Sequence, residues 1–85
     1  MFTPNLHTMP VKLLFFGVLT DVTGTHEVAL EPVADVAALK AAVAAQFPGV
    51  AEYQFNVAVN QEIIHENAPI KDGDEVAFMP PYSGG

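Results

Sequence analysis

The sequence predicts an α+β domain in which one helix packs across one face of a mixed β-sheet. Several short segments alternate apolar and polar residues with the period of two typical of strands, whereas one alanine-rich segment has the period of a helix. The chain has 85 residues, enough for one domain, and 51% of them are hydrophobic. A small, well-filled core is therefore expected.

Two strands are expected first. Residues 11–18 are β-branched and aromatic, and residues 25–31 alternate cleanly, with His26 on the inward face. Residues 20–24 contain glycine and threonine and interrupt the pattern. The two strands are therefore expected to pair as a hairpin.

One helix follows these strands. Asp35 is a good N-cap, and residues 36–47 are rich in alanine, which has the highest helix propensity. The apolar side chains on one helical stripe are Val36, Leu39, Val43 and Phe47. Pro48 and Gly49 are expected to end the helix.

Three short strands complete the expected sheet, at residues 55–59, 62–66 and 75–79. A turn at Asn60 and Gln61 joins the first two, and an Asp-Gly turn within residues 71–74 precedes the last. This element order matches the ubiquitin-like β-grasp best, although periodicity alone does not separate it from other small α+β sheets. The expected organisation is a leader over residues 1–9, the domain over residues 10–80 and an extended tail over residues 81–85.

Strand alternation divides the apolar side chains between two faces of this sheet. The side chains expected to face the helix are Leu13, Phe15, Val57, Val59, Val76 and Phe78. The opposite face is expected to carry Leu14, Phe16, Ala77 and Met79, together with Ile63 or Ile64. An apolar face of this kind is expected to be covered by a partner, and the alternative is that these residues are scattered singly over the surface. The expected partner interface comprises Leu14, Phe16, Ile63, Met79, Pro80 and Pro81.

Charge and residue types exclude several classes of function. Three lysines and no arginine stand against ten carboxylates, a net charge of −7, so neither nucleic acid nor a membrane surface is an expected partner. A protein with a basic patch complements this charge better. The chain has no cysteine, its three histidines have no zinc-type spacing, and residues 72–75 lack most ligands of a calcium loop, so no metal site is expected. No catalytic arrangement is visible inside the domain.

The two ends of the sequence lead to different predictions. The first residues lack the basic and apolar segments of a secretory signal, so a cytoplasmic protein is expected, with Met9 as an alternative start. At the other end, Pro80 and Pro81 cannot continue a strand ladder, and Gly84 and Gly85 have no side chain. Such a tail reaches roughly 16 Å and would present its terminal carboxylate to another protein's active site. The alternative is that this end is simply frayed and rich in small residues.

Three segments resemble one family. They are the strand Val-Lys-Leu-Leu-Phe-Phe at residues 11–16, Val-Ala-Val-Asn-Gln at residues 57–61, and Asp-Gly-Asp-Glu-Val-Ala-Phe-Met-Pro-Pro at residues 72–81 with the terminal Gly-Gly. Together they resemble the MoaD-type sulfur carriers, the small subunits of molybdopterin synthase, over residues 11–85. Met79 departs from the aromatic residue that this family often has, and the leader is extra.

The resemblance implies a β-grasp carrier, a non-catalytic subunit of an enzyme complex. In this family an E1-like enzyme uses ATP to adenylate the last glycine, and a sulfur donor then converts it to a thiocarboxylate. These two groups are transient modifications, and no permanently bound cofactor is implied. The loaded tail enters the large synthase subunit, where sulfur passes to cyclic pyranopterin monophosphate and forms the dithiolene. Gly85 would carry the sulfur, Gly84 would allow passage, and two small and two large subunits would form a heterotetramer.

Two other functions remain open at this point. One is the sulfur carrier of thiazole synthesis in the thiamine pathway, which shares the fold and the Gly-Gly end. The other is a ubiquitin-like modifier whose terminal glycine is joined to lysines.

Overall fold

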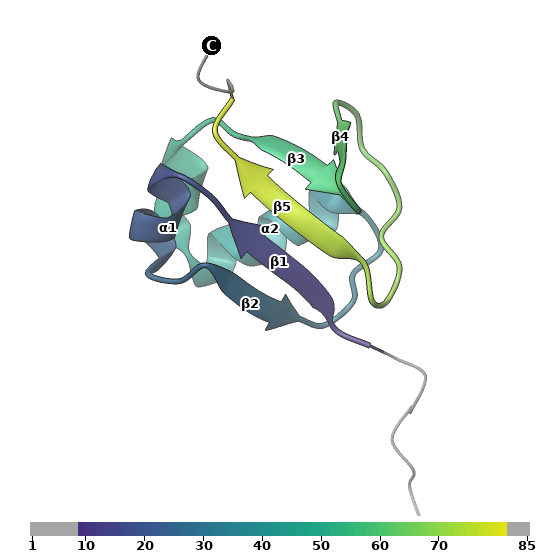
Figure 1. The fold of residues 1–85 in the computed structure, drawn as a ribbon. Coiled ribbons are helices and arrows are strands. Elements are labelled where there is room, and N and C mark those ends of the chain that lie inside the picture. Colours follow the sequence, from purple (N-terminus) through teal and green to yellow (C-terminus); the bar gives the residue numbers. More distant parts are fainter. Residues whose placement is uncertain (1–8, 82–85) are drawn as a thin grey trace, which may run out of the picture.

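The first and last strands of the domain lie side by side at the centre of its sheet. The computed structural model describes residues 9–81 and shows a five-stranded mixed sheet in the order β2-β1-β5-β3-β4 (Figure 1). β1 and β5 run parallel, with Leu13 opposite Val76 and Phe15 opposite Phe78, and the other three pairings are antiparallel. The strands are β1 (Val11–Phe15), β2 (Glu27–Leu30), β3 (Asn56–Val59), β4 (Glu62–Ile64) and β5 (Glu75–Met79).

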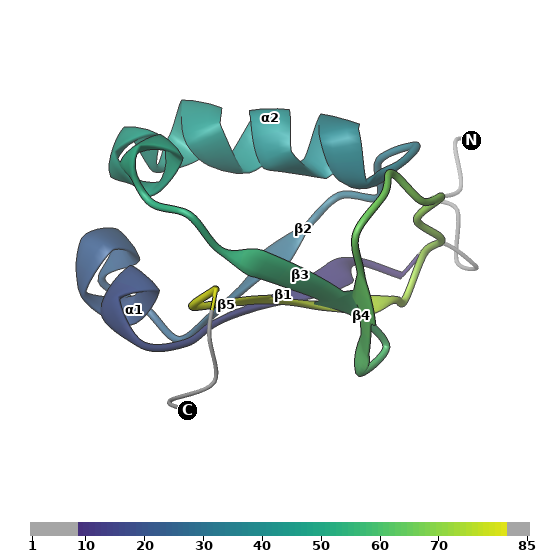
Figure 2. The same cartoon turned by 90° about the horizontal axis from the view of Figure 1, so that it is seen from above.

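One long helix covers one face of this sheet. α2 (Val36–Gln46) lies across it, and the opposite face carries no helix in the part of the chain that the structure describes (Figure 2). Two shorter elements, α1 (Val18–Thr23) and the 3₁₀ helix η1 (Pro48–Glu52), follow β1 and α2 respectively. The predicted α+β class, with one main helix on one face of a mixed sheet, is confirmed.

The core lies between α2 and the sheet. The stripe predicted for the helix is buried at Val36, Leu39 and Val43, and Phe47 packs against the same core. The aromatic rings of β1 and β5 meet there: Phe15 and Phe78 are edge-to-face at 5.9 Å, and Phe55 stacks on Phe78 at 4.4 Å. Such contacts add to the burial of large apolar surfaces, so this cluster is a main source of stability.

Two side chains satisfy the free amides at the start of α2. Asp35 accepts a hydrogen bond from the Ala38 amide at 2.8 Å, as its predicted role as N-cap requires. Asn67 comes from the loop after β4, accepts from the Ala37 amide at 2.9 Å and donates to Asp35 at 3.2 Å. The bond from Ala38, and then the bond from Asn67, lower the pKa of the Asp35 carboxyl below its usual value.

The turn between β3 and β4 is a two-residue hairpin loop. Asn60 and Gln61 both have positive φ, at 51° and 72°, as a type I′ turn requires. The Asn60 side chain accepts from the Glu75 amide at 3.0 Å and donates to Asp74 at 3.1 Å. These bonds join this turn to the start of the central strand β5. The pKa of Asp74 is lowered, first by the hydrogen bond from the Lys71 amide and then by that from Asn60.

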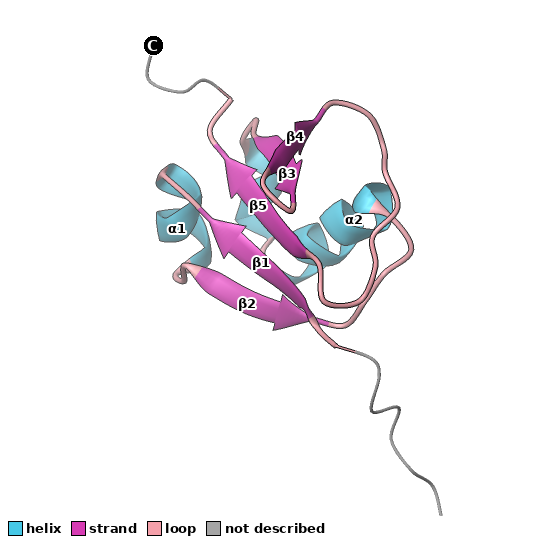
Figure 3. Ribbon diagram, turned by 45° about the vertical axis from the view of Figure 1, so that its right-hand side comes forward, coloured by secondary structure: helices cyan, strands magenta, loops and turns pink. Residues whose placement is uncertain are grey.

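The prediction of a strand over residues 11–18 is wrong beyond Phe15. The strand predicted over residues 11–18 ends at Phe15, and α1 begins at Val18. Gly17, with φ of +61°, ends the extended backbone, and the buried Leu19 holds the short helix against the core. Figure 3 shows α1 at the end of the sheet where β1 and β5 finish.

Smaller differences concern the edges of the sheet. His26 precedes β2 and is exposed, so its predicted inward position is wrong. β2, β3 and β4 are each shorter than predicted, whereas β5 has the predicted bounds. α2 ends before Pro48 as expected, and the chain continues directly into η1, which adds Val50 to the core.

Candidate functional site

The face of the sheet opposite α2 contains an open apolar hollow. Figure 1 looks onto this face, with α2 behind the sheet. The hollow has a volume of about 370 Å³, and we refer to it as the outer hollow; its lining residues are Leu14, Phe16, Ala58, Gln61, Ile63, Glu75, Ala77 and Met79. It is built from β1, β5, β3 and β4, with one lining residue from the turn between β3 and β4.

The register of the strands explains the shape of the outer hollow. Ala77 on the central strand lies between Leu14 of β1 and Ala58 of β3, and Ala58 in turn pairs with Ile63. Two small methyl side chains therefore lie side by side, and longer apolar side chains surround them. Phe16 is 46% exposed and Ile63 is 48% exposed, so the large side chains at this rim remain open to solvent.

The lining of the outer hollow is apolar except at one side. Glu75 carries its single charge and Gln61 its amide, and both lie where β5 begins and β3 ends. An apolar hollow with a carboxylate at its rim suits a protein partner that brings an apolar side chain together with a basic group.

The structure brings together four of the six side chains predicted for the partner interface. Leu14, Phe16, Ile63 and Met79 all line the outer hollow, whereas Ile64 packs against the core. That this hollow contacts a partner remains a prediction. Ala58, Gln61 and Glu75 also line it and were not predicted, because the alternation of a single strand does not show which strands become neighbours.

Pro80 and Pro81 follow β5 and do not line the hollow. Pro80 is half-buried and Pro81 is exposed, with its carbonyl accepting a hydrogen bond from Asn56 at 3.2 Å. The predicted carrier residue Gly85 and the predicted passage residue Gly84 lie outside the described residues.

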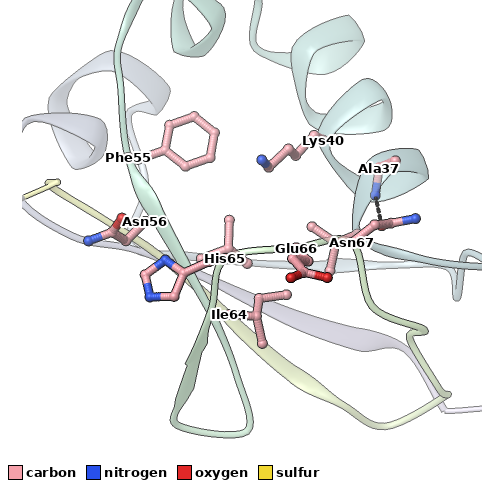
Figure 4. A pocket seen from close by; sticks show the side chains of 10 residues that line it. Ala37, Lys40, Phe55, Asn56, Ile64, His65, Glu66 and Asn67 are labelled. Atoms are coloured by element: carbon pink, nitrogen blue, oxygen red, sulfur yellow. Dashed lines mark hydrogen bonds between the residues drawn. The ribbon is translucent and has the colours of Figure 1, made fainter.

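A second cleft lies between α2 and the strands β3 and β4 (Figure 4). It has a volume of about 270 Å³, and the Lys40 ammonium lies 5.7 Å from the centre of the Phe55 ring. Asn67, which also lines it, already uses both ends of its amide at the start of α2. His65 and Glu66 are exposed on the opposite side of the cleft. The arrangement pairs no base with a nucleophile, so it offers no evident catalytic chemistry.

Other features of residues 9–81 also fail to indicate chemistry inside the domain. Within these residues no side chain that is polar or charged is buried, and no three carboxylates or imidazoles are grouped so that they could hold a metal ion. None of the helices in this part of the chain is both long and apolar enough to cross a membrane. The arrangement that remains is the open apolar hollow, whose central strand β5 leads directly into the C-terminal segment.

Comparison with known proteins identifies relatives of this domain. The family model for the ThiS family matches residues 13–85. The molybdopterin synthase sulfur carrier subunit of Escherichia coli is 39% identical over 82 residues, which are 88% of this chain and 99% of that protein. This confirms the resemblance to the small subunits of molybdopterin synthase.

Solved structures agree with the fold. A complex of subunits 1 and 2 of the molybdopterin-converting factor from Helicobacter pylori contains a chain with a TM-score of 0.68 and 29% identity, covering 91% of this chain and 100% of that one. The small archaeal modifier protein 1 of Methanosarcina acetivorans, at 23% identity and a TM-score of 0.75, covers 93% and 99% and shows the shared fold alone. By the extent of the family match and the identity to a full-length relative, the chain belongs to the ThiS family.

Proposed function

We propose that this chain is the sulfur carrier subunit of a molybdopterin synthase. The observation that carries the proposal is the 39% identity with a protein of that name over 99% of that protein's length. The structure supports it in a second way, because the strand at the centre of the outer hollow, β5, is the one that continues into the C-terminal segment. Docking at the hollow would therefore bring that segment to the partner.

The proposed chemistry takes place at the carboxylate of Gly85. An E1-like enzyme would transfer AMP from ATP to this carboxylate and release pyrophosphate, because a carboxylate oxygen is a poor leaving group. A sulfur donor would then displace AMP and leave a thiocarboxylate, whose sulfur is a good nucleophile. The domain itself would supply no acid, base or metal to these steps; it would supply docking and a tail that can enter another protein's active site.

The proposed partner is the large subunit of the synthase. A structural relative was solved as a complex of subunits 1 and 2 of a molybdopterin-converting factor, which supports a two-subunit assembly. In this assembly the thiocarboxylate sulfur would attack cyclic pyranopterin monophosphate. Hydrolysis of the resulting thioester would leave that sulfur on the substrate and return the Gly85 carboxylate, and a second loaded carrier would supply the other sulfur of the dithiolene. A cytoplasmic location is part of the proposal, because ATP-dependent activation takes place there.

The test is sulfur transfer in a reconstituted system of carrier, large subunit and cyclic pyranopterin monophosphate. Deletion of Gly85 should abolish transfer and leave the melting temperature nearly unchanged, since it withdraws the carboxylate by about 3.3 Å, the length of a near-attack contact. Extension beyond Gly85 should have the same effect. Gly84→Val should slow transfer, because a branched side chain then lies beside the carboxylate. Wild-type transfer by the truncated protein would contradict the proposal.

Two measurements separate the alternatives. A modifier would appear in its own cell as isopeptide adducts of higher mass, whereas a carrier stays free or activated at its end, so intact mass spectrometry distinguishes them. A carrier of the thiamine pathway would be loaded with sulfur and yet give no dithiolene with the large subunit. Co-purification of the large subunit with this chain would favour the molybdopterin pathway.

A further inference from the structure

The C-terminal segment leaves the sheet between two contacts, and neither of them is part of the outer hollow. Pro80 packs against Gly17, the residue between β1 and α1, and Pro81 accepts the hydrogen bond from Asn56, the first residue of β3. We call these four residues the tail anchor. The anchor lies where β1 and β5 finish and β3 begins, next to Met79 at the end of the outer hollow.

Gly17 provides the space for the first proline. A Cβ atom on Gly17 would lie 2.7 Å from Cγ of Pro80, closer than such atoms approach in real proteins. Just before this contact, the Phe16 amide donates to the Phe78 carbonyl at 3.1 Å, so β1 and β5 remain bonded up to the anchor. Pro80 has no amide hydrogen and cannot extend this ladder. The sheet therefore ends at Pro80, with its ring packed against Gly17.

The two prolines leave one backbone torsion free. The pyrrolidine rings fix φ at both residues, and ψ of Pro80 is restricted because a proline follows it. The remaining angle is ψ of Pro81, which decides where the carbonyl of Pro81 points and in which direction the chain continues. A hydrogen bond to that carbonyl restricts this angle.

Asn56 makes that hydrogen bond. Its Nδ2 donates to the Pro81 carbonyl oxygen at 3.2 Å, across 25 positions of the sequence. Asn56 is paired with Met79 across the β3–β5 ladder, so its side chain lies on the face of the outer hollow beside the last residue of β5. Asn56 also lines the second cleft, but in Figure 4 its amide points away from Lys40 and Phe55.

We propose that Asn56 is a positioning residue that fixes the direction in which the C-terminal segment leaves the domain. This inference rests on the proposed carrier function, because only a segment that delivers a reacting group needs a defined direction. The bond lies at an exposed site and Asn56 contributes little to the core, so its loss should change transfer more than stability. A fixed ψ at Pro81 lowers the entropy that must be lost when the carboxylate reaches the reaction site.

The first test compares three variants in the reconstituted synthase. Asn56→Ala removes the donor, and Asn56→Asp keeps the shape while replacing the donor by an acceptor. Gln54→Ala is the matched control, because Gln54 is an exposed amide on the same segment that makes no hydrogen bond within residues 9–81. Loss of one hydrogen bond should lower the single-turnover rate of sulfur transfer roughly two- to tenfold. The affinity for the large subunit and the melting temperature should stay at wild-type values, and the control should transfer normally.

The second test does not depend on sulfur transfer. NMR order parameters of the Tyr82 amide report on the peptide plane that contains the Pro81 carbonyl, and they should fall in Asn56→Ala and Asn56→Asp but not in Gln54→Ala. Unchanged order would overturn the anchor itself. Lower order with a wild-type transfer rate would overturn the positioning role. A wild-type chain that transfers no sulfur would contradict the proposed function, and with it the task assigned to Asn56, even where the order parameters show that the anchor exists.

Discussion

The two faces of the sheet are made by alternate residues of the same strands, and both are apolar, yet within residues 9–81 only one is covered by a helix. On the inner face Leu13, Val76 and Phe78 are each 0% exposed, because α2 lies over them. One residue along the chain, Leu14, Ala77 and Met79 line an open hollow. The comparison shows that a shift of a single position along the chain separates a side chain buried in the core from one that lines the open hollow.

The largest effect is expected on the inner face. Phe78→Ala should lower the free energy of unfolding by about 3–5 kcal/mol, because the ring contacts both Phe15 and Phe55 and its loss leaves a cavity. Urea denaturation measures this effect, and Phe78→Leu should cost less. A loss below about 1 kcal/mol would mean that the inner face is not the main source of stability.

The next effect is expected on the outer face and on binding. Phe16→Asp and Met79→Asp should each weaken association with the large subunit by about 3 kcal/mol, roughly a hundredfold, because a carboxylate would be buried without a partner. Ala29→Asp is the matched control, since Ala29 shares this face through its pairing with Lys12 but does not line the hollow. Calorimetry gives the affinity, and circular dichroism gives the stability.

Either of two results would contradict the roles assigned to the two faces of the sheet. Normal binding by both variants would mean that the outer hollow is not the docking surface. Unfolding of both variants would mean that these side chains belong to the core and that the strand alternation is inverted.

A smaller effect is expected at Asn60, which belongs neither to the core nor to the lining of the outer hollow. Asn60→Ala should lower the free energy of unfolding by about 1–2 kcal/mol, because it puts a side chain with a Cβ and no polar group at positive φ and removes the bonds to Asp74 and Glu75. Asn60→Gly keeps the backbone freedom and loses only the bonds, so thermal denaturation of both variants separates the two causes. Equal affinity of the folded variants for the large subunit is expected, and a changed affinity would show that the turn contributes to docking.

The smallest effect is a dependence of stability on pH. The folded state lowers the pKa of Asp35, so the stability that this carboxylate contributes is fully present well above pH 3.8 and is lost as the pH falls below that value. Asp35→Asn keeps a capping side chain at neutral pH and removes this titration. The melting temperature of this variant should therefore fall less steeply than that of the wild type between about pH 5 and pH 3, the range over which free carboxyls titrate. If the slope of melting temperature against pH stays unchanged, other groups such as Asp74 cause the loss of stability in acid.

The sequence predicts best those features that depend on neighbouring residues. The N-cap Asp35, the stripe on α2 and the strict alternation of β5 are each set by local spacing, and all are found where they were predicted. The division of apolar side chains between the two faces follows from the same alternation. It is therefore also predicted correctly on β1 and β5.

Features that depend on distant residues were not predicted. α1 contains four β-branched residues in six and has no side-chain cap, so its local preference opposes a helix. Burial of Leu19 and hydrogen bonds from Thr20 to Phe15 and from Thr23 to Leu19 stabilise it. Ala77 was predicted on the outer face, but its place beside Ala58 and the bond from Asn56 to Pro81 need the pairing of β3 with β5, which sequence periodicity does not give.

The central place of β5 has a consequence for biosynthesis. β5 is made last of the strands, but it pairs with β1 on one side and with β3 on the other. While β5 is still inside the ribosome, the two halves of the sheet have no strand to join them, and the rings of Phe15 and Phe55 lack their common neighbour Phe78. The nascent chain therefore completes neither the core nor the outer hollow until β5 emerges, so the finished hollow exists only on chains whose synthesis has passed the last strand.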